Sequence, residues 1–432
     1  MKDQLKRMFL ETLDELAIEG VFRRKLRVEG GTLEIGDERL ELDGFKKILA
    51  VAIGKAAHEM AEAFAKAVEP ATVSGVVISS VERRPPPRFV GYHGGHPYPN
   101  SESVRSALVL EEFLDDLKPN YLVVYLLSGG GSAVCEAPVD PAIGLDELRE
   151  FYRLLVTCGA DIVQMNTLRK HLSAVKGGRL AAWAQPARQA TLYISDVPAG
   201  RASTVASGPT MPDESTLADC EALLDELELR PRLPASYRRL FDEKRVPETP
   251  KPGDPAFENC SWHALLDNGD AVEALRRRAE AAGWTAAVDL SMDDRPVAEA
   301  ADRLLARLEE LRQEHPGRPA AVITGGELSS PVLGDGRGGR NLAFVLDCVP
   351  KIAGRPIAVL SAGTDGVDGN SPAAGAAADG KTLSRAQEMG LDPIDFYRRS
   401  DSFTFFERLD EAIVTGPTGN NVRDVRVLAA QP

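Results

Sequence analysis

The chain has 432 residues, 43% of them hydrophobic and 27% charged, and its 65 acidic against 51 basic residues give a net charge of −14. This mixture is typical of folded globular proteins and argues against extensive disorder. The negative charge opposes nonspecific binding to nucleic acid or to an anionic membrane, so an anionic ligand requires local positive charge. The length exceeds what one core usually supports and predicts two domains.

The first residues favour a packed helix over a targeting segment, because Leu5, Phe9, Leu13 and Leu16 recur at helical spacing without an uninterrupted apolar run. No stretch of about 18 apolar residues predicts a membrane span. The five cysteines are widely spaced and lack a CxxC pair, which indicates neither a disulfide framework nor a zinc site. We therefore expect a protein of the reducing cytoplasm.

The first half of the chain alternates between strand and helix patterns. Residues 46–53 read as a buried strand, and residues 56–68 contain the helix formers that should follow it. Similar apolar runs recur at 74–79, 121–127 and 191–195. This order predicts a mostly parallel sheet that is covered by helices.

A proline-rich segment at 245–255 is the strongest break in the pattern, because proline removes backbone donors and restricts helix formation. We place a linker at 246–256, after a Rossmann-like domain at 1–245 and before a second α/β domain at 257–432. Strand and helix patterns alternate again after the break. The predicted fold class is therefore α/β, with two α/β domains built on mostly parallel, helix-covered sheets.

Four glycine-rich loops lie where predicted strands give way to helices. Glycine lets the backbone approach a ligand closely, and the start of a helix offers N–H groups to an anion, so the four loops together suggest phosphoryl transfer. The loop Ser128–Ser132 is not a Walker loop, which would read GxxxxGK[ST]. The predicted phosphate- or substrate-binding positions in these loops are Ser128, Gly129, Gly130, Gly131, Ser132, Gly325, Gly326, Gly338, Gly339 and Asn341.

Several basic side chains accompany these loops. Lys55 begins a helix after the strand 46–53, where its ammonium either holds a phosphoryl group or is simply solvated. His96, in the turn Gly94–Pro97, either binds substrate or caps its loop. The basic stretch 166–179 reads either as a solvated helical face or as a local attraction for an anionic ligand.

Four carboxylates follow predicted strands: Asp196, Glu327, Asp365 and Asp368. Magnesium prefers oxygen ligands of this kind, whereas a single carboxylate at such a place can also cap a helix. Their recurrence at one edge of the sheets favours magnesium binding.

Nine motifs follow one another along the chain: AIGKAA, GGHPYPN, LSGGGSA, GADIVQMNTLRKHLSAVKGGRLA, ISDVPAGRASTVASGPTMPD, ITGGELS, GRGGRN, SAGTDGVDGNSPAAGA and TGPTGNNVRDV. This ordered set resembles the class II glycerate kinase family, whose C-terminal part is the MOFRL domain, here expected at about 317–425. The resemblance implies ATP- and Mg²⁺-dependent phosphorylation of D-glycerate to 2-phosphoglycerate in a cleft between two α/β domains. It singles out Lys55 and Arg340 as active-site cations. It implies a small-molecule substrate and a nucleotide as partners, and it is compatible with a homodimer.

The chain also departs from the family pattern. Relatives usually read ISDVxGD where this chain has Asp196 followed by Val-Pro-Ala-Gly and Arg201, so one acidic residue is missing. Asn341 is followed by Leu-Ala instead of the common Gln-Glu, and Asn420 replaces a common threonine. These changes bear on substrate choice and metal dependence.

Two roles for Asp196 stay open: binding the metal or accepting the proton of the substrate hydroxyl. Two rival functions are an NAD(P)H-dependent hydroxypyruvate reductase and a noncatalytic ligand-binding relative. The first requires GxGxxG after a strand and an acidic residue about 20 positions later, and no strand here supplies that pattern.

Overall fold

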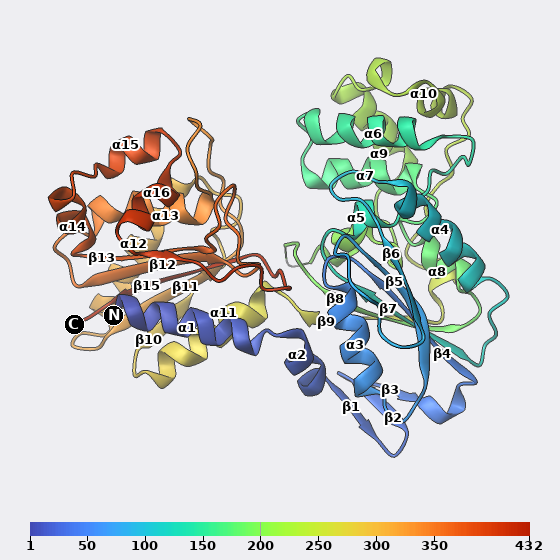
Figure 1. The fold of residues 1–432 in the computed structure, drawn as a ribbon, viewed down its shortest axis with the longest axis horizontal. Coiled ribbons are helices and arrows are strands. Elements are labelled where there is room, and N and C mark those ends of the chain that lie inside the picture. The colour runs from blue at the N-terminus through green and yellow to red at the C-terminus, as the bar shows by residue number, and fades with distance from the viewer. Residues whose placement is uncertain (199) are drawn as a thin grey trace. The chain divides into compact units, whose positions relative to one another are not determined.

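The computed structural model describes residues 1–198 and 200–432, which form two compact units. Ile18–Leu265 form one of them, the central unit. Met1–Ala17 and Leu266–Pro432 together form the other, the split unit (Figure 1). Each unit contains its own six-stranded sheet.

The sheet of the central unit has the order β6-β5-β4-β7-β8-β9, and every pair from β6 to β8 is parallel. This agrees with the parallel sheet that the buried apolar runs predict. A small antiparallel sheet precedes it, with strands β1 (Leu26–Glu29), β2 (Thr32–Ile35) and β3 (Glu38–Glu41). The six strands are β4 (Lys47–Ile53), β5 (Val73–Ser79), β6 (Phe89–His93), β7 (Tyr121–Leu127), β8 (Arg188–Ile194) and β9 (Cys260–Leu266).

Helices cover both faces of the central sheet. One face packs against α3 (Ala57–Ala67), which also contacts α2 (Ile18–Lys25). The other face shares a hydrophobic core with α4 (Ser101–Leu114), α5 (Gly131–Val134) and α8 (Arg179–Trp183). The remaining helices form a second cluster of their own (Figure 1): α6 (Leu145–Thr157), α7 (Ile162–Leu172), α9 (Leu217–Glu226) and α10 (Ala235–Asp242).

The sheet of the split unit is mostly antiparallel, so the expectation of a mostly parallel sheet is wrong here. Its order is β10-β11-β15-β12-β13-β14, and only the pair β10–β11 is parallel within the described residues. A parallel connection needs a crossover, usually a helix, whereas a loop joins β12 to β13 and the last strand inserts antiparallel between β11 and β12. The strands are β10 (Thr285–Val288), β11 (Ala320–Gly325), β12 (Ile357–Gly363), β13 (Gly375–Asp379), β14 (Ala412–Ile413) and β15 (Asp424–Ala430).

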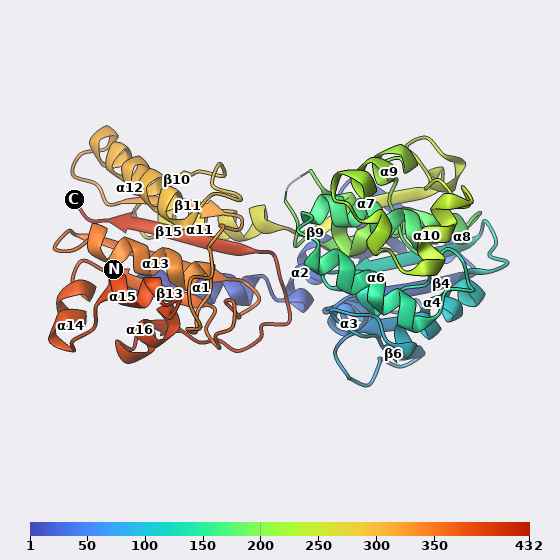
Figure 2. The same ribbon diagram turned by 90° about the horizontal axis from the view of Figure 1, so that it is seen from above.

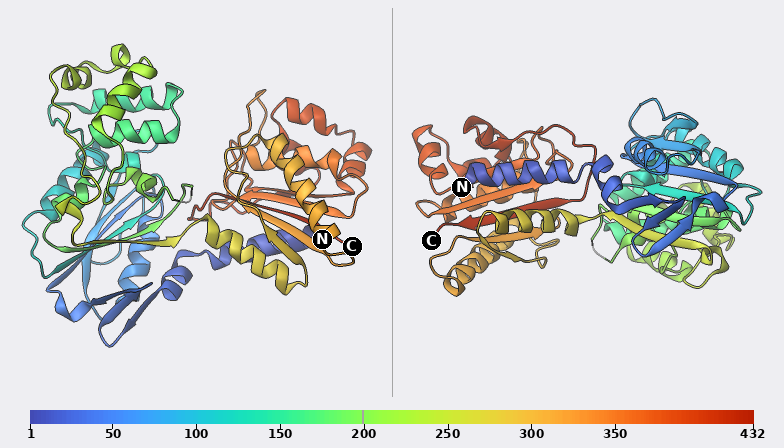
Figure 3. Two further views of the ribbon diagram at one scale, coloured as in Figure 1. Left: turned by 180° about the vertical axis from the view of Figure 1, so that it is seen from behind. Right: turned by 90° about the horizontal axis from the view of Figure 1, so that it is seen from below.

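Two helices cover each face of this second sheet. From below, α1 (Lys2–Glu15) and α11 (Asn268–Ala281) lie side by side across one face (Figure 3). From above, α12 (Val297–Glu314) and α13 (Arg340–Lys351) lie on the opposite face (Figure 2). Three short helices complete the unit: α14 (Thr382–Glu388), α15 (Pro393–Arg398) and α16 (Ser402–Arg408). None of the helices in the described part of the chain is both long and apolar enough to cross a membrane.

The units differ from the predicted domains at both ends of the central unit. Helix α1 buries Leu5 and Phe9, and it packs with the split unit because its apolar face completes a layer beside α11. The proline-rich segment does not separate the units: Val246 and Thr249 are buried, and Arg179 donates a hydrogen bond to the carbonyl oxygen of Pro247. The chain then forms β9 on the central sheet before it passes into the split unit after Leu265.

Candidate active site

Three strands of the central sheet end side by side and deliver three predicted site segments to one edge. β4 and β7 pair in register up to Ile53 and Leu127, and β8 pairs beyond β7. The loop after β4 bonds to the loop after β7, because Lys55 N donates to Gly129 O at 2.9 Å and Ala56 N donates to Ser128 Oγ at 3.1 Å. The carboxyl edge of a parallel sheet is where ligands of α/β proteins usually bind.

The triple glycine allows these segments to touch. Gly130 has φ +80°, and a Cβ there would lie 3.0 Å from Lys55 Cγ and 3.3 Å from His96 Cδ2. A Cβ on Gly129 would lie 2.0 Å from Asp196 Oδ2. Only glycine fits both positions, so the loop is built for close approach.

A cavity of about 280 Å³ opens at this edge. Ser132 Oγ lies 2.7 Å from Ser207 Oγ, which in turn donates to Asn166 Oδ1 at 2.9 Å, so a neutral hydrogen-bonded chain runs along the wall. The sequence prediction did not include Ser207 or Asn166 as site residues. The lining residues are His96, Pro97, Gly130, Ser132, Ala133, Tyr152, Val156, Ile162, Asn166, Arg169, Asp196, Val197, Thr204 and Ala206.

The imidazole of His96 belongs to the cavity wall. Its own loop is held instead by Ser103, whose hydroxyl accepts hydrogen bonds from the backbone of Gly95 and Asn100. Burial, and then the positive charges of Lys55 and Arg169, lower the pKa of His96 below its usual 6.5. The neutral imidazole is therefore favoured at neutral pH.

The basic stretch 166–179 is neither a solvated face nor a uniform attraction for anions. Lys170 is buried and pairs with Asp213 at 3.1 Å, and Lys176 is buried and pairs with Glu136 at 2.6 Å. Both lysines are thus neutralised inside the unit. Arg169, which comes directly before Lys170 in the sequence, lines the cavity instead.

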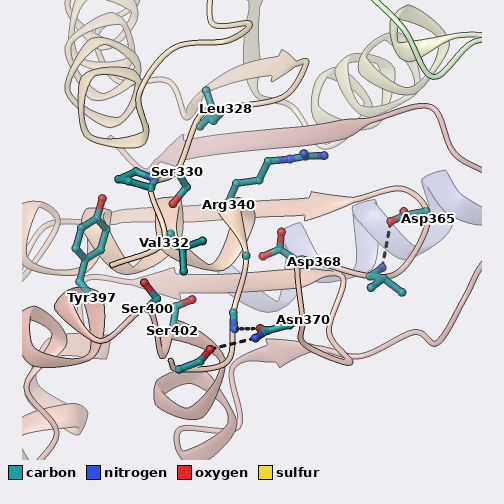
Figure 4. A pocket seen from close by; sticks show the side chains of 17 residues that line it. Leu328, Ser330, Val332, Arg340, Asp365, Asp368, Asn370, Tyr397, Ser400 and Ser402 are labelled. Carbon is teal, nitrogen blue, oxygen red and sulfur yellow. Dashed lines mark hydrogen bonds between the residues drawn. The ribbon is translucent and has the colours of Figure 1, made fainter. Parts of the chain in front are cut away.

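In the split unit, a pocket of about 610 Å³ surrounds Arg340 at the start of α13 (Figure 4). Asn370 holds the glycine-rich loop on its wall, accepting a hydrogen bond from Gly338 N and donating one to Gly336 O. Figure 4 shows these bonds beside Arg340. The lining also includes the predicted residues Gly338, Gly339, Asp365 and Asp368.

Two carboxylates hold the guanidinium of Arg340. Its Nε lies 2.6 Å from Asp424 Oδ2, and its Nη2 lies 3.2 Å from Asp424 Oδ1 and 3.0 Å from Glu327 Oε1. Burial works against the charged form, but the hydrogen bond and charge of Asp424 outweigh it and raise the pKa of Arg340. Glu327 is therefore a partner of Arg340.

Sequence reasoning missed Asp424. It begins β15 and is buried, and it also lies 3.2 Å from Nη2 of the fully buried Arg426. The available signal was an acidic residue between two arginines at the start of an apolar strand, in the segment RDVRVLAA. A buried carboxylate in such a place usually has a cationic partner.

Asp368 caps a helix. Its carboxylate accepts hydrogen bonds from Asn341 N at 3.1 Å and Leu342 N at 2.8 Å, at the first turn of α13. Burial raises the pKa of Asp368 to about 6. Within residues 1–198 and 200–432 no group of three or more His, Cys, Asp or Glu side chains is arranged to hold a metal ion.

The other predicted positions in this unit lie in packed surroundings. The side chain of Asn341 is buried and accepts a hydrogen bond from Ser361 Oγ at 2.6 Å. A Cβ on Gly325 would lie 1.7 Å from Asn268 Oδ1, and one on Gly326 would lie 2.8 Å from Asp293 Oδ1. These glycines allow close packing inside the unit, and their role in ligand binding stays a prediction. Ala199, in the loop where an acidic residue was expected, lies outside the described residues.

The chain matches two described families: "Domain of unknown function (DUF4147)" over residues 4–242, and "MOFRL family" over residues 320–424. The D-glycerate 2-kinase of Thermotoga maritima is 33% identical over 98% of both chains. A protein of Agrobacterium vitis with the provisional name hydroxypyruvate reductase is 35% identical over 88% of this chain and 87% of its own. Among solved structures, a glycerate kinase of Thermotoga maritima superposes with a TM-score of 0.86, at 30% identity over 99% of both chains.

Proposed function

Because this chain belongs to the glycerate kinase family with a C-terminal MOFRL domain, we propose that it transfers a phosphoryl group from ATP to D-glycerate and forms 2-phosphoglycerate. The observation that carries the proposal is the meeting of Lys55, His96 and Asp196 around the loop Gly129–Gly130 at the carboxyl edge of the central sheet, where His96 and Asp196 also line a small cavity. These groups suit a small anionic substrate and a phosphoryl group.

Two cations supply charge for the transfer. Phosphoryl transfer depends mainly on positioning and on electrostatic stabilisation of the equatorial oxygens. The exposed ammonium of Lys55 extends from the first turn after β4, and the guanidinium of Arg340 is fixed by Asp424. We infer that both cations are required for turnover.

Asp196 has two candidate roles in the reaction. Its carboxylate lies against Gly129 in the cavity wall, and the first role is to accept the proton of the substrate hydroxyl. The alternative is that it holds the cation that accompanies the nucleotide. Asp196→Asn separates these roles, because loss of a metal ligand raises the Mg²⁺ concentration needed for half-maximal rate, whereas loss of a base lowers kcat at every Mg²⁺ concentration.

The side chains fit Mg²⁺ as an ion that arrives with ATP. Magnesium commonly uses one or two carboxylates together with nucleotide phosphates, so it does not need a cage of protein ligands. Asp196 and Asp365 each line a pocket and are the candidates. Glu327 is paired with Arg340, and Asp368 caps α13, which makes both less suited to this role.

An assay of ADP release with D-glycerate tests the function, and phosphorus NMR of the product identifies the hydroxyl that is phosphorylated. The name carried by the Agrobacterium vitis relative motivates a second arm, with hydroxypyruvate and NADH or NADPH. Oxidation of the nicotinamide without any ADP release would make the kinase proposal wrong. Calorimetric binding of glycerate and ATP without turnover would instead favour a noncatalytic relative.

A further inference from the structure

Arg169 is a cation at the wall of the cavity in the central unit, and none of residues 1–198 and 200–432 forms an ion pair with it. It extends from α7 (Ile162–Leu172), and its guanidinium lies 5.2 Å from the centre of the Tyr152 ring. Its Nε is buried, and no hydrogen bond reaches it from any residue that the structure describes. Buried polar groups are normally hydrogen-bonded, so an unbonded Nε in a residue that lines a cavity indicates that the guanidinium is completed by a partner that enters from outside.

The neighbouring cations Lys170 and Lys176, unlike Arg169, both have carboxylate partners among the described residues. Lys170 and Lys176 come from the same basic stretch, and each has a buried carboxylate within 3.1 Å. The fold therefore neutralises the positive charge of this stretch where no ligand can reach it. It leaves Arg169 unneutralised where the cavity opens.

The aromatic ring that lies beside the guanidinium of Arg169 is held in place by hydrogen bonds of its own. The hydroxyl of Tyr152 donates to Ser132 O at 2.8 Å and also bonds to the buried Glu136, which holds the ring below the guanidinium in place. Stacking on a fixed ring restrains the plane of an arginine fork. Such a fork matches the two oxygens of a carboxylate.

The size and wall of the cavity favour a small acid. Its volume of about 280 Å³ lies just below the range of roughly 300–1,000 Å³ typical of sites for drug-sized ligands. The chain of Ser132, Ser207 and Asn166 offers neutral groups that can bond to hydroxyls. Lys55 and His96 both approach the position that a Cβ on Gly130 would take, so we assign the phosphoryl group to this end of the site and the acid group to Arg169.

We propose that Arg169 binds the carboxylate of the hydroxy acid substrate and thereby makes the site select acids over uncharged polyols. This assignment rests on the function proposed above. Arg169 is then a substrate-binding residue distinct from the cations that act on the phosphoryl group.

The test compares Arg169→Met, Arg169→Lys and the full wild-type chain in steady-state ADP release. We expect Arg169→Met to raise the KM for D-glycerate about 10- to 100-fold, the usual value of a charge-assisted hydrogen bond, and to leave the KM for ATP unchanged. The preference for D-glycerate over glycerol should fall by the same factor. Arg169→Lys should recover part of the affinity, because it keeps the charge and loses the fork.

Arg153→Met is the matched control. Arg153 also lies over a tyrosine ring, 5.9 Å from the centre of Tyr98, but it is exposed and does not line the cavity. It should keep the wild-type KM for both substrates. Thermal unfolding of each variant separates loss of binding from loss of structure, and Arg169→Lys carries the test if the methionine variant does not fold.

The outcomes separate a failure of the Arg169 assignment from a failure of the proposed function. A wild-type KM for D-glycerate in Arg169→Met, or a rise confined to the KM for ATP, overturns the assignment. If the wild-type chain releases no ADP with D-glycerate, the proposed function is wrong, and calorimetric titration with small 2-hydroxy carboxylates still tests Arg169. Equal affinity of the wild type and Arg169→Met for such acids would then refute it.

Discussion

The guanidinium of Arg340 is bound to the carboxylate of Asp424 through two contacts, at 2.6 and 3.2 Å, and the same carboxylate lies 3.2 Å from the fully buried Arg426. One acidic side chain therefore orients the proposed catalytic cation and balances a second charge in the core. Because 84 residues separate Arg340 and Asp424 in sequence, the pair also ties the start of α13 to the start of β15.

Asp424→Asn should impair both stability and turnover. Removing one partner of a buried ion pair leaves an uncompensated charge, here Arg426, and typically costs about 3–5 kcal/mol. Urea denaturation measures this loss, and the ADP-release assay measures the accompanying fall in kcat. Asp302→Asn is the control, since Asp302 forms an exposed pair with Lys351 and its loss should cost about 1 kcal/mol or less. Equal stability of the two variants would contradict the role given to Asp424.

Arg340→Ala should depress turnover far more than stability. An arginine that stabilises a transferring phosphoryl group contributes roughly 10³ to 10⁵ in rate. The folded state should tolerate the change, because Asp424 keeps Arg426 as its partner. Arg337→Ala is the control from the same loop: its guanidinium is exposed and lies over the ring of Phe403. A kcat within tenfold of the wild type would remove Arg340 from the mechanism.

Lys55→Gln should lower kcat by a factor on the order of 10³, because it removes one full charge from the proposed phosphoryl site. Lys47→Gln provides the comparison. Lys47 is an exposed lysine at the opposite end of the same strand, β4, where it lies over the ring of Tyr121. The prediction is wrong if the two variants have the same kcat.

Gly130→Ala should lose activity through crowding. The left-handed conformation at φ +80° costs a non-glycine residue roughly 1–2 kcal/mol, and the added Cβ would press on Lys55 and His96. Gly253→Ala shares the conformational cost, with φ +87°, but its Cβ would meet nothing within 4 Å. We expect similar falls in melting temperature for both variants and a loss of kcat for Gly130→Ala alone. Full activity of Gly130→Ala would show that the contact with Lys55 does not matter.

Asp368 should give the stability a distinctive pH dependence. Its folded pKa of about 6 lies above the unfolded value of 3.8, so the folded state binds its proton more tightly. The resulting stabilisation is complete below pH 3.8 and is lost as pH rises through 6, a change on the order of 3 kcal/mol. The difference in unfolding free energy between wild type and Asp368→Asn should therefore move against the wild type between pH 4 and 7. A difference that stays constant over this range would contradict the raised pKa.

The parallel sheet could be predicted because its strands are buried on both faces and read as continuous apolar runs. The strand predicted at 191–195 starts three residues after the observed start of β8, because β8 begins with the polar residues Arg188 and Gln189. The antiparallel sheet could not be predicted in the same way. Its central strand, β15, comes last in the chain, and nothing local to 424–430 specifies that it inserts between β11 and β12.

In the candidate site, too, residues with a local sequence signature could be predicted, and residues whose role depends on a distant partner could not. The glycine loop and Lys55 have local signatures, and their position follows from the rule that the strands of a parallel sheet share a carboxyl edge. Arg169 could not be distinguished from Lys170 by sequence, because their difference depends on Asp213, 43 residues beyond Lys170. Whether a basic residue is neutralised inside the unit or available to a ligand depends on carboxylates that only folding brings close to it.

The order in which the chain is synthesised has a consequence for the split unit. Helix α1 is synthesised before the central unit, yet the layer it completes with α11 is made only after the 248 residues of that unit, roughly 12 to 50 seconds later at typical translation rates. The contiguous central unit can fold on the ribosome during that interval, whereas Leu5 and Phe9 lack the neighbours that bury them in the folded chain. The apolar face of the nascent helix is therefore available to chaperones during this interval, and relocating the helix after Pro432 by circular permutation would remove the delay.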